Sequence, residues 1–102
     1  MEIAVTQVGN SPHIFVRGEV DERGAEELKH RFGELKLAAG ADVVFDFGGV
    51  THIGSAGIGK LLLFYKTVAS IGGAIQIERA PATIVDLFQQ LKLDTIFTIS
   101  KR

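Results

Sequence analysis

Alternating apolar and polar residues open the chain and predict a pair of neighbouring strands. Apolar residues alternate loosely with polar ones over Glu2–Val8, and the alternation returns over His13–Arg17. Between the two segments lies Gly9-Asn10-Ser11-Pro12, a cluster of turn-forming residues. The short spacing predicts that these two strands form a hairpin.

Three later segments repeat apolar residues every three or four positions, the spacing of one helical face. The first follows Asp21, a suitable N-cap, and is expected to close at Gly40. The second is expected to end at Gly72-Gly73, and the third to have Pro81 as its first residue. The apolar positions are Ala25, Leu28, Phe32, Leu35 and Ala39, then Ile58, Leu61, Leu62, Tyr65, Val68 and Ala69, then Ile84, Val85, Leu87, Phe88 and Leu91.

Short apolar runs between these helices predict further strands. Val43–Phe47 has the pattern of a central strand covered on both faces, and Gly48-Gly49 is expected to break it. Ala74–Glu78 predicts another strand, and the segment Ile96–Ile99 predicts a last short strand or a packed tail. A hairpin followed by alternating helices and strands indicates an α/β fold. We expect one domain over residues 1–102, a four- to five-stranded mixed sheet that is largely parallel after the hairpin, and three to four helices.

Composition and charge narrow the function. The chain has 102 residues, 46% of them hydrophobic, a formal charge of −1 and no cysteine. Dispersed charges offer no basic surface for nucleic acid or an anionic membrane. The start lacks a signal-peptide pattern, and no apolar run is long enough to span a bilayer. We therefore expect a cytoplasmic protein with no membrane insertion and no nucleic-acid partner.

No group of residues predicts catalysis. The three histidines have no spacing typical of a metal site, and no nucleophile and base can be paired. Asp46, a polar residue within an apolar strand, is expected to accept hydrogen bonds from nearby loop amides. We expect no catalytic residues, no metal, no cofactor and no enzymatic activity.

The segment Gly54–Lys60 carries the main candidate chemistry and has several interpretations. It matches the phosphate-binding P-loop pattern G-x-x-x-x-G-K, but Leu61 replaces the Ser or Thr that would bind Mg²⁺. That residue also falls on the apolar face of its helix, so a nucleotide-binding enzyme is the least favoured hypothesis. Ser55 can instead act as a helix N-cap, with Gly57 and Gly59 allowing the helix to approach the sheet closely. Alternatively, the glycines leave the hydroxyl of Ser55 uncrowded, which suits a phosphate acceptor at a helix N-terminus.

The same region resembles the STAS domains of bacterial anti-sigma-factor antagonists. In that family an apolar strand and a short turn lead into Asp-Ser-Ser-Gly-Leu-Gly, and here Val43–Phe47 and Val50–Ile53 lead into Gly54-Ser55-Ala56-Gly57-Ile58-Gly59. Gly18-Glu19-Val20-Asp21, Gly72-Gly73 and the closing segment Leu87–Phe97 also match, so the resemblance covers essentially the whole chain. It implies that Ser55 is phosphorylated by an anti-sigma factor that is itself a serine kinase. It also implies that phosphorylation blocks binding of that partner and that a phosphatase reverses it.

Two departures from the family pattern keep a second hypothesis open. Gly54 stands where the family has an acid, and Ala56 stands where it has a second serine. These departures favour a STAS docking subunit that is not phosphorylated, in a lipid-transport ABC system or a larger signalling assembly. For either function we expect the partner to contact Asp21, Gly54, Ser55, Ala56, Gly57, Ile58 and Leu63. Leu63 and Phe64 would form an exposed apolar pair, which also leaves a homodimer open.

Overall fold

The computed structural model describes all residues 1–102 and confirms the predicted α/β architecture. The hairpin is present, and three α-helices follow in alternation with strands. The elements are β1 (Glu2–Val8), β2 (Ser11–Val20), α1 (Glu22–Glu34), β3 (Val43–Ile53), α2 (Ser55–Ser70), β4 (Ile75–Ala80), α3 (Ala82–Gln90), the 3₁₀ turn η1 (Leu93–Thr95) and β5 (Phe97–Lys101).

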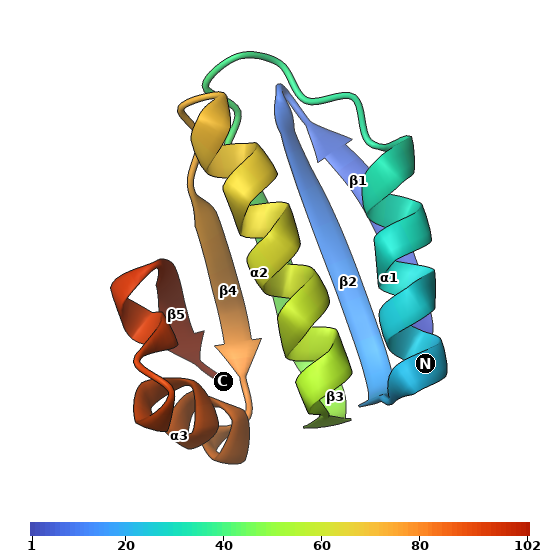
Figure 1. The fold of residues 1–102 in the computed structure, drawn as a ribbon, viewed down its shortest axis with the longest axis vertical. Coiled ribbons are helices and arrows are strands. Elements are labelled where there is room, and N and C mark those ends of the chain that lie inside the picture. The colour runs from blue at the N-terminus through green and yellow to red at the C-terminus, as the bar shows by residue number, and fades with distance from the viewer.

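The five strands form one mixed sheet in the order β1-β2-β3-β4-β5. Strands β1 and β2 pair antiparallel, and every later pair is parallel. Figure 1 shows α1 and α2 lying side by side across the sheet, with α3 beside β4 and β5. Because β2, β3 and β4 run in the same direction, each ends at the same edge of the sheet and leads into a helix there.

One continuous core lies between the sheet and its helices. Phe45 of β3 is fully buried, and the rings of Phe32 on α1 and Phe64 on α2 both pack edge-on against it. On the other side of α2, Phe97 contacts Tyr65 and Phe88, which joins α3 to the same core. All three helices therefore pack against one face of the sheet.

The opposite face carries no helix, so the expectation that β3 is covered on both faces is wrong. Phe15 on this face is 41% exposed, and its register partner Asp46 is only half-buried. Val44 is buried there because it lies in register between His13 and Gln76 on the neighbouring strands. The apolar run of β3 thus reflects its central position rather than a second layer of helices.

Two boundaries differ from the predicted ones. Helix α1 ends at Glu34, not near Gly40, because Leu35 turns to extended backbone (φ −75°, ψ 135°). Leu35 and Leu37 still pack against the core, but from a loop, and Leu35 continues the apolar spacing of α1 although it lies outside the helix. Strand β3 continues through Gly48-Gly49 instead of breaking, because a register shift there forms a β-bulge.

Smaller differences lie near the C-terminal half. Pro81 is the N-cap of α3 rather than its first residue, and Leu91 is 50% exposed rather than buried. The segment after Ile96 is a strand, β5, which resolves the choice between a strand and a packed tail.

Candidate partner-binding site

The ends of β2 and β3 bring the candidate residues together at one edge of the sheet. Val20 and Ile53 are partners in the parallel register, and the amide of Gly54 donates to the carbonyl of Val20 at 3.0 Å. Asp21 directly follows Val20, and Ser55 directly follows Gly54. Two segments that are 34 positions apart in the sequence therefore form one surface, because parallel strands end at the same edge.

Ser55 is the first residue of α2, and Gly54 is the N-cap. The interpretation of Ser55 as the N-cap is therefore wrong by one position. Its hydroxyl makes no hydrogen bond within the chain, and the residue is exposed. Glycine has no side chain with which to cap, so the first turn of α2 keeps unpaired backbone N–H groups. The hydroxyl of Ser55 is free to react at a helix end that favours negative charge.

Asp21 is the N-cap of α1, as predicted. Its Oδ1 accepts a hydrogen bond from the amide of Gly24 at 2.8 Å, and this bond lowers the pKa of the Asp21 carboxyl below its usual value. The carboxylate is exposed and charged at neutral pH. Asp21 thus places a fixed negative charge beside the start of α2.

The two glycines of α2 have different environments. Gly57 is buried, and a Cβ there would lie 2.7 Å from Val20 Cγ1 and 3.0 Å from Ile53 Cγ1. It therefore allows α2 to approach the sheet and does not clear space around Ser55. A Cβ on Gly59 would meet nothing within 4 Å, and this residue faces a surface hollow that Ala56 also lines.

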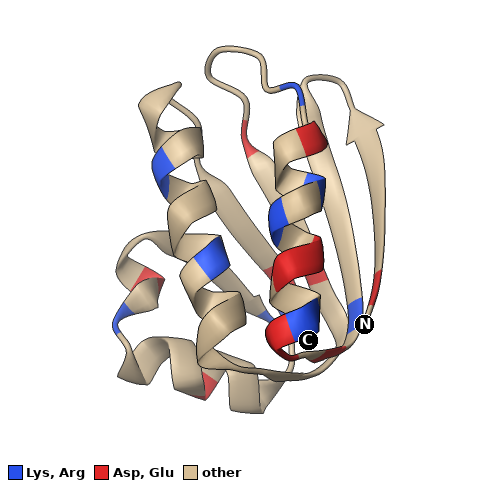
Figure 2. Ribbon diagram, turned by 45° about the vertical axis from the view of Figure 1, so that its right-hand side comes forward, with Lys and Arg blue, Asp and Glu red and all other residues tan.

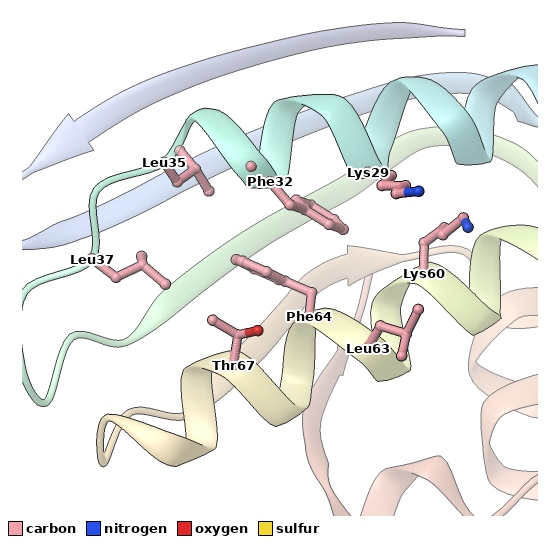
Figure 3. Close-up of a pocket in the computed structure, with 9 residues that line it drawn as sticks. Lys29, Phe32, Leu35, Leu37, Lys60, Leu63, Phe64 and Thr67 are labelled. Carbon is pink, nitrogen blue, oxygen red and sulfur yellow. The ribbon is translucent and has the colours of Figure 1, made fainter.

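An apolar groove between α1 and α2 continues this surface away from Ser55. It has a volume of about 400 Å³. In Figure 3, Phe32 and Phe64 point toward each other from the two helices, and their rings are stacked at 4.1 Å between centroids. Lys29 and Lys60 lie near one end, and leucines of the loop after α1 lie at the other. The α1 side of this groove was missed in the sequence because the loop leucines were assigned to a helix.

The predicted apolar pair separates in the structure. Leu63 lies at the rim of the groove and is 59% exposed, whereas Phe64 forms its floor and is 5% exposed. Ile58 is half-buried against the core. Leu63 is therefore the single large apolar side chain that α2 projects into solvent.

Charge is distributed unequally between the two helices. Figure 2 shows basic and acidic residues mixed along α1, whereas α2 carries only basic ones. These are Lys60 and Lys66. The Nζ of Lys60 lies 3.6 Å from a carboxylate oxygen of Glu26 on α1, so this lysine bridges the helices.

The geometry does not support a P-loop. Leu61, which stands where the Mg²⁺ ligand would be, is fully buried in the core. Lys60, the lysine of the pattern, is directed to Glu26 instead of the loop. No three His, Cys, Asp or Glu side chains come together as metal ligands, and none of the helices has the length and apolar character to cross a membrane.

Comparisons with known proteins agree with this fold. The family model described as "Mlab, STAS domain" matches residues 3–99, and the chain belongs to the STAS domain family. It is 26% identical over 102 residues to the anti-sigma-B factor antagonist of Bacillus subtilis, covering 100% of this chain and 93% of that protein. Anti-sigma factor antagonists are generally regulators rather than enzymes.

Solved structures show the same fold. An anti-sigma factor antagonist from Mycobacterium paratuberculosis superposes with a TM-score of 0.81 at 24% identity, covering 99% of this chain and 86% of that one. The Bacillus cell fate determinant SpoIIAA in its phosphorylated form has a TM-score of 0.73 at 16% identity, covering 99% and 93% of the two chains.

Proposed function

We propose that this chain is an anti-sigma factor antagonist that is switched off by phosphorylation of Ser55. Its partner would be an anti-sigma factor that is also the serine kinase, and a phosphatase would restore binding. The observation that carries the proposal is the free, exposed hydroxyl of Ser55 at an uncapped helix start, beside an apolar groove. Because an anti-sigma factor acts on transcription, the proposed binding would take place in the cytoplasm.

The proposed contact surface has a polar part and an apolar part. Asp21, Gly54, Ser55, Ala56 and Ile58 form the edge where β2 and β3 end. Leu63 adds an exposed apolar anchor at the groove rim. Gly57 supports the surface from below, since it is buried. Of the two residues expected to form a homodimer contact, only Leu63 is exposed, because Phe64 is part of the core.

A phosphate on Ser55 would change this surface without unfolding it. It adds a charge of about −1.5 to −2, which the positive end of a helix tolerates. The only charged side chains on α2 are Lys60 and Lys66, and Lys60 pairs with Glu26 of α1, so the unmodified helix itself carries no negative charge. An acidic partner surface would be repelled by the phosphorylated helix start.

The proposal is tested by binding measurements with the cognate kinase, which is identified from the genes encoded next to this one. With ATP it should add one phosphate, at Ser55. Ser55→Ala should bind whether or not ATP is present, and Ser55→Asp should bind at least ten-fold more weakly than the unmodified chain. Ala82→Asp is a matched control, because Ala82 is the exposed first residue of α3. It adds the same charge to a helix start outside the proposed surface and should leave binding unchanged.

Either of two results would contradict the switch. One is a Ser55→Asp variant that binds as tightly as the unmodified chain. The other is an equal loss of binding in Ala82→Asp, which would indicate a general charge effect rather than a local one.

A non-phosphorylated docking subunit remains the second candidate, and Gly54 is the residue that favours it. A Cβ on Gly54 would make only an ordinary contact, 3.7 Å from the Val20 carbonyl, and the backbone there is extended (φ −89°). Gly54→Asp is therefore sterically permitted and restores the family's acid. Under the switch proposal it should increase the rate of Ser55 phosphorylation. A docking subunit would bind its partner equally with or without the acid and would accept no phosphate in either form.

A further inference from the structure

The face of the sheet opposite the helices holds a cluster of three arginines around the β-bulge of β3. Arg17 comes from β2, Arg79 from the end of β4, and Arg102 follows β5. All three meet at Gly48-Gly49, although they are up to 85 positions apart in the sequence. This cluster is on the far side of the sheet from the α1–α2 groove, so it is independent of the proposed function.

Close contacts define the cluster. The Arg79 guanidinium carbon would lie 3.0 Å from a Cβ on Gly48, and Arg17 Cγ would lie 2.7 Å from a Cβ on Gly49. Arg102 Nη1 donates to the carbonyl oxygen of Gly48 at 2.7 Å. The two glycines therefore leave the room that the arginine side chains fill.

Carboxylates also lie on this face of the sheet: Asp46, its register partner Glu78, and Glu2, the register partner of Arg17. Asp46 is the only carboxylate in an ion pair here: its Oδ2 lies 3.4 Å from Arg79 Nη1, and its Oδ1 accepts the Gly48 amide at 2.8 Å. The latter bond confirms that Asp46 accepts a backbone amide, although the donor lies within β3 and not in a loop. Neither Arg17 nor Arg102 forms an ion pair with another residue. Glu78, the register partner of Asp46, is exposed and forms no ion pair.

Backbone strain adds a second, independent observation. Arg79 has φ +58°, in the left-handed region that an arginine rarely adopts. Such a conformation is strained and persists where the surrounding structure imposes it, often at binding sites. Here the result is that the Arg79 guanidinium is directed back over Gly48.

Arg17 and Arg79 border a hollow of about 350 Å³ that is also lined by the exposed side chain of Phe15 and by Asp46. Guanidinium groups bind phosphate through paired, charge-assisted hydrogen bonds. We propose that this hollow binds a small phosphorylated molecule, with its phosphate on Arg17 and Arg79 and an apolar or aromatic part against Phe15.

The test is calorimetric titration with phenyl phosphate, with inorganic phosphate as a second probe. The unmodified chain should bind phenyl phosphate saturably, and more tightly than inorganic phosphate because of the contact with Phe15. Arg17→Gln and Arg79→Gly should each weaken binding about ten-fold or more. Arg79→Gly removes the guanidinium and also relieves the positive φ, so loss of binding by this variant cannot be attributed to a strained fold.

Lys29→Gln is the matched control, because it removes one positive charge from the helix-covered side. It should change the affinity less than about two-fold. The proposal is overturned if binding is not saturable, or if Lys29→Gln weakens it as much as the arginine variants do. It is also overturned if the chain binds vesicles of phosphatidic acid in phosphatidylcholine but neither soluble phosphate, since the ligand would then be a membrane surface.

Discussion

Gly57 and Gly59 occupy opposite environments on the same helix, so one substitution tests how α2 is held against the sheet. A Cβ on Gly57 would lie 2.7 Å from Val20 Cγ1 and 3.0 Å from Ile53 Cγ1, and both of those side chains are buried. A Cβ on Gly59 would meet nothing within 4 Å. The difference between the two alanine variants therefore isolates the packing of α2 on the sheet.

The change in the free energy of unfolding follows from two opposing effects. Alanine in place of glycine favours the helix by up to ~1 kcal/mol at either position. Overpacking a core costs roughly 1–3 kcal/mol, and only Gly57→Ala incurs it. Gly57→Ala should thus change the free energy of unfolding by about 0 to −3 kcal/mol, and Gly59→Ala by up to about +1 kcal/mol. The two variants should differ by about 1–3 kcal/mol, whatever the exact helix propensity.

Urea unfolding followed by circular dichroism measures this difference directly. The dependence of the unfolding free energy on urea should be the same for both variants, because neither changes the surface exposed on unfolding. Equal midpoints for the two variants, or a higher midpoint for Gly57→Ala, would refute the close approach of α2 to Val20 and Ile53.

Three further predictions test other parts of the fold and site. A Cβ on Gly73 would lie 1.8 Å from the Ala41 carbonyl oxygen, so Gly73→Ala should destabilise the domain by more than ~3 kcal/mol; thermal unfolding within a few degrees of the unmodified chain would contradict this. Phe64→Ala should lower the free energy of unfolding by about 3–5 kcal/mol because the ring is buried, and chemical denaturation measures this loss. Leu63→Ala should lower it by less than about 0.5 kcal/mol yet weaken partner binding, which a binding assay would show. Because folding lowers the pKa of Asp21, its ionised form contributes stability above pH 3.8, and this contribution is lost as the pH falls through the lower folded pKa. The difference in unfolding free energy between the unmodified chain and Asp21→Asn should be constant near neutral pH and shrink below about pH 4. A difference that does not depend on pH would exclude the effect.

Periodicity in the sequence predicted the order and type of the elements, because each amphipathic segment has one face to bury. It predicted too long a helix α1, since Leu35 packs against the core from the loop and follows Phe32 by three positions, the spacing that a helix would also give. The pattern also predicted that β3 ends at Gly48-Gly49, whereas the strand continues there through a bulge. Arginines from β2 and β4 fill the space above those glycines, and no local pattern encodes that contact.

The candidate site was predicted in position but not in detail. Motif spacing placed Ser55 at the start of α2, and the adjacent ends of β2 and β3 explain why Asp21 lies at the same edge. A shift of one position in the helix start decides whether Gly54 or Ser55 is the N-cap, and a sequence pattern does not resolve a single position. The groove beyond them depends on how two helices pack, so only Leu63 on its rim could be foreseen.

The shared direction of β2, β3 and β4 has an electrical consequence for the whole molecule. Three helices begin at one edge of the sheet, and each start carries roughly half a positive charge. Asp21 neutralises the first, but Gly54 and Pro81 leave the other two without a side-chain cap or an acid in the first turn. Two helix starts therefore remain without a neutralising group in a chain with a formal charge of −1. A phosphate on Ser55 would neutralise the start of α2, so the phosphorylated chain should be the more heat-stable form.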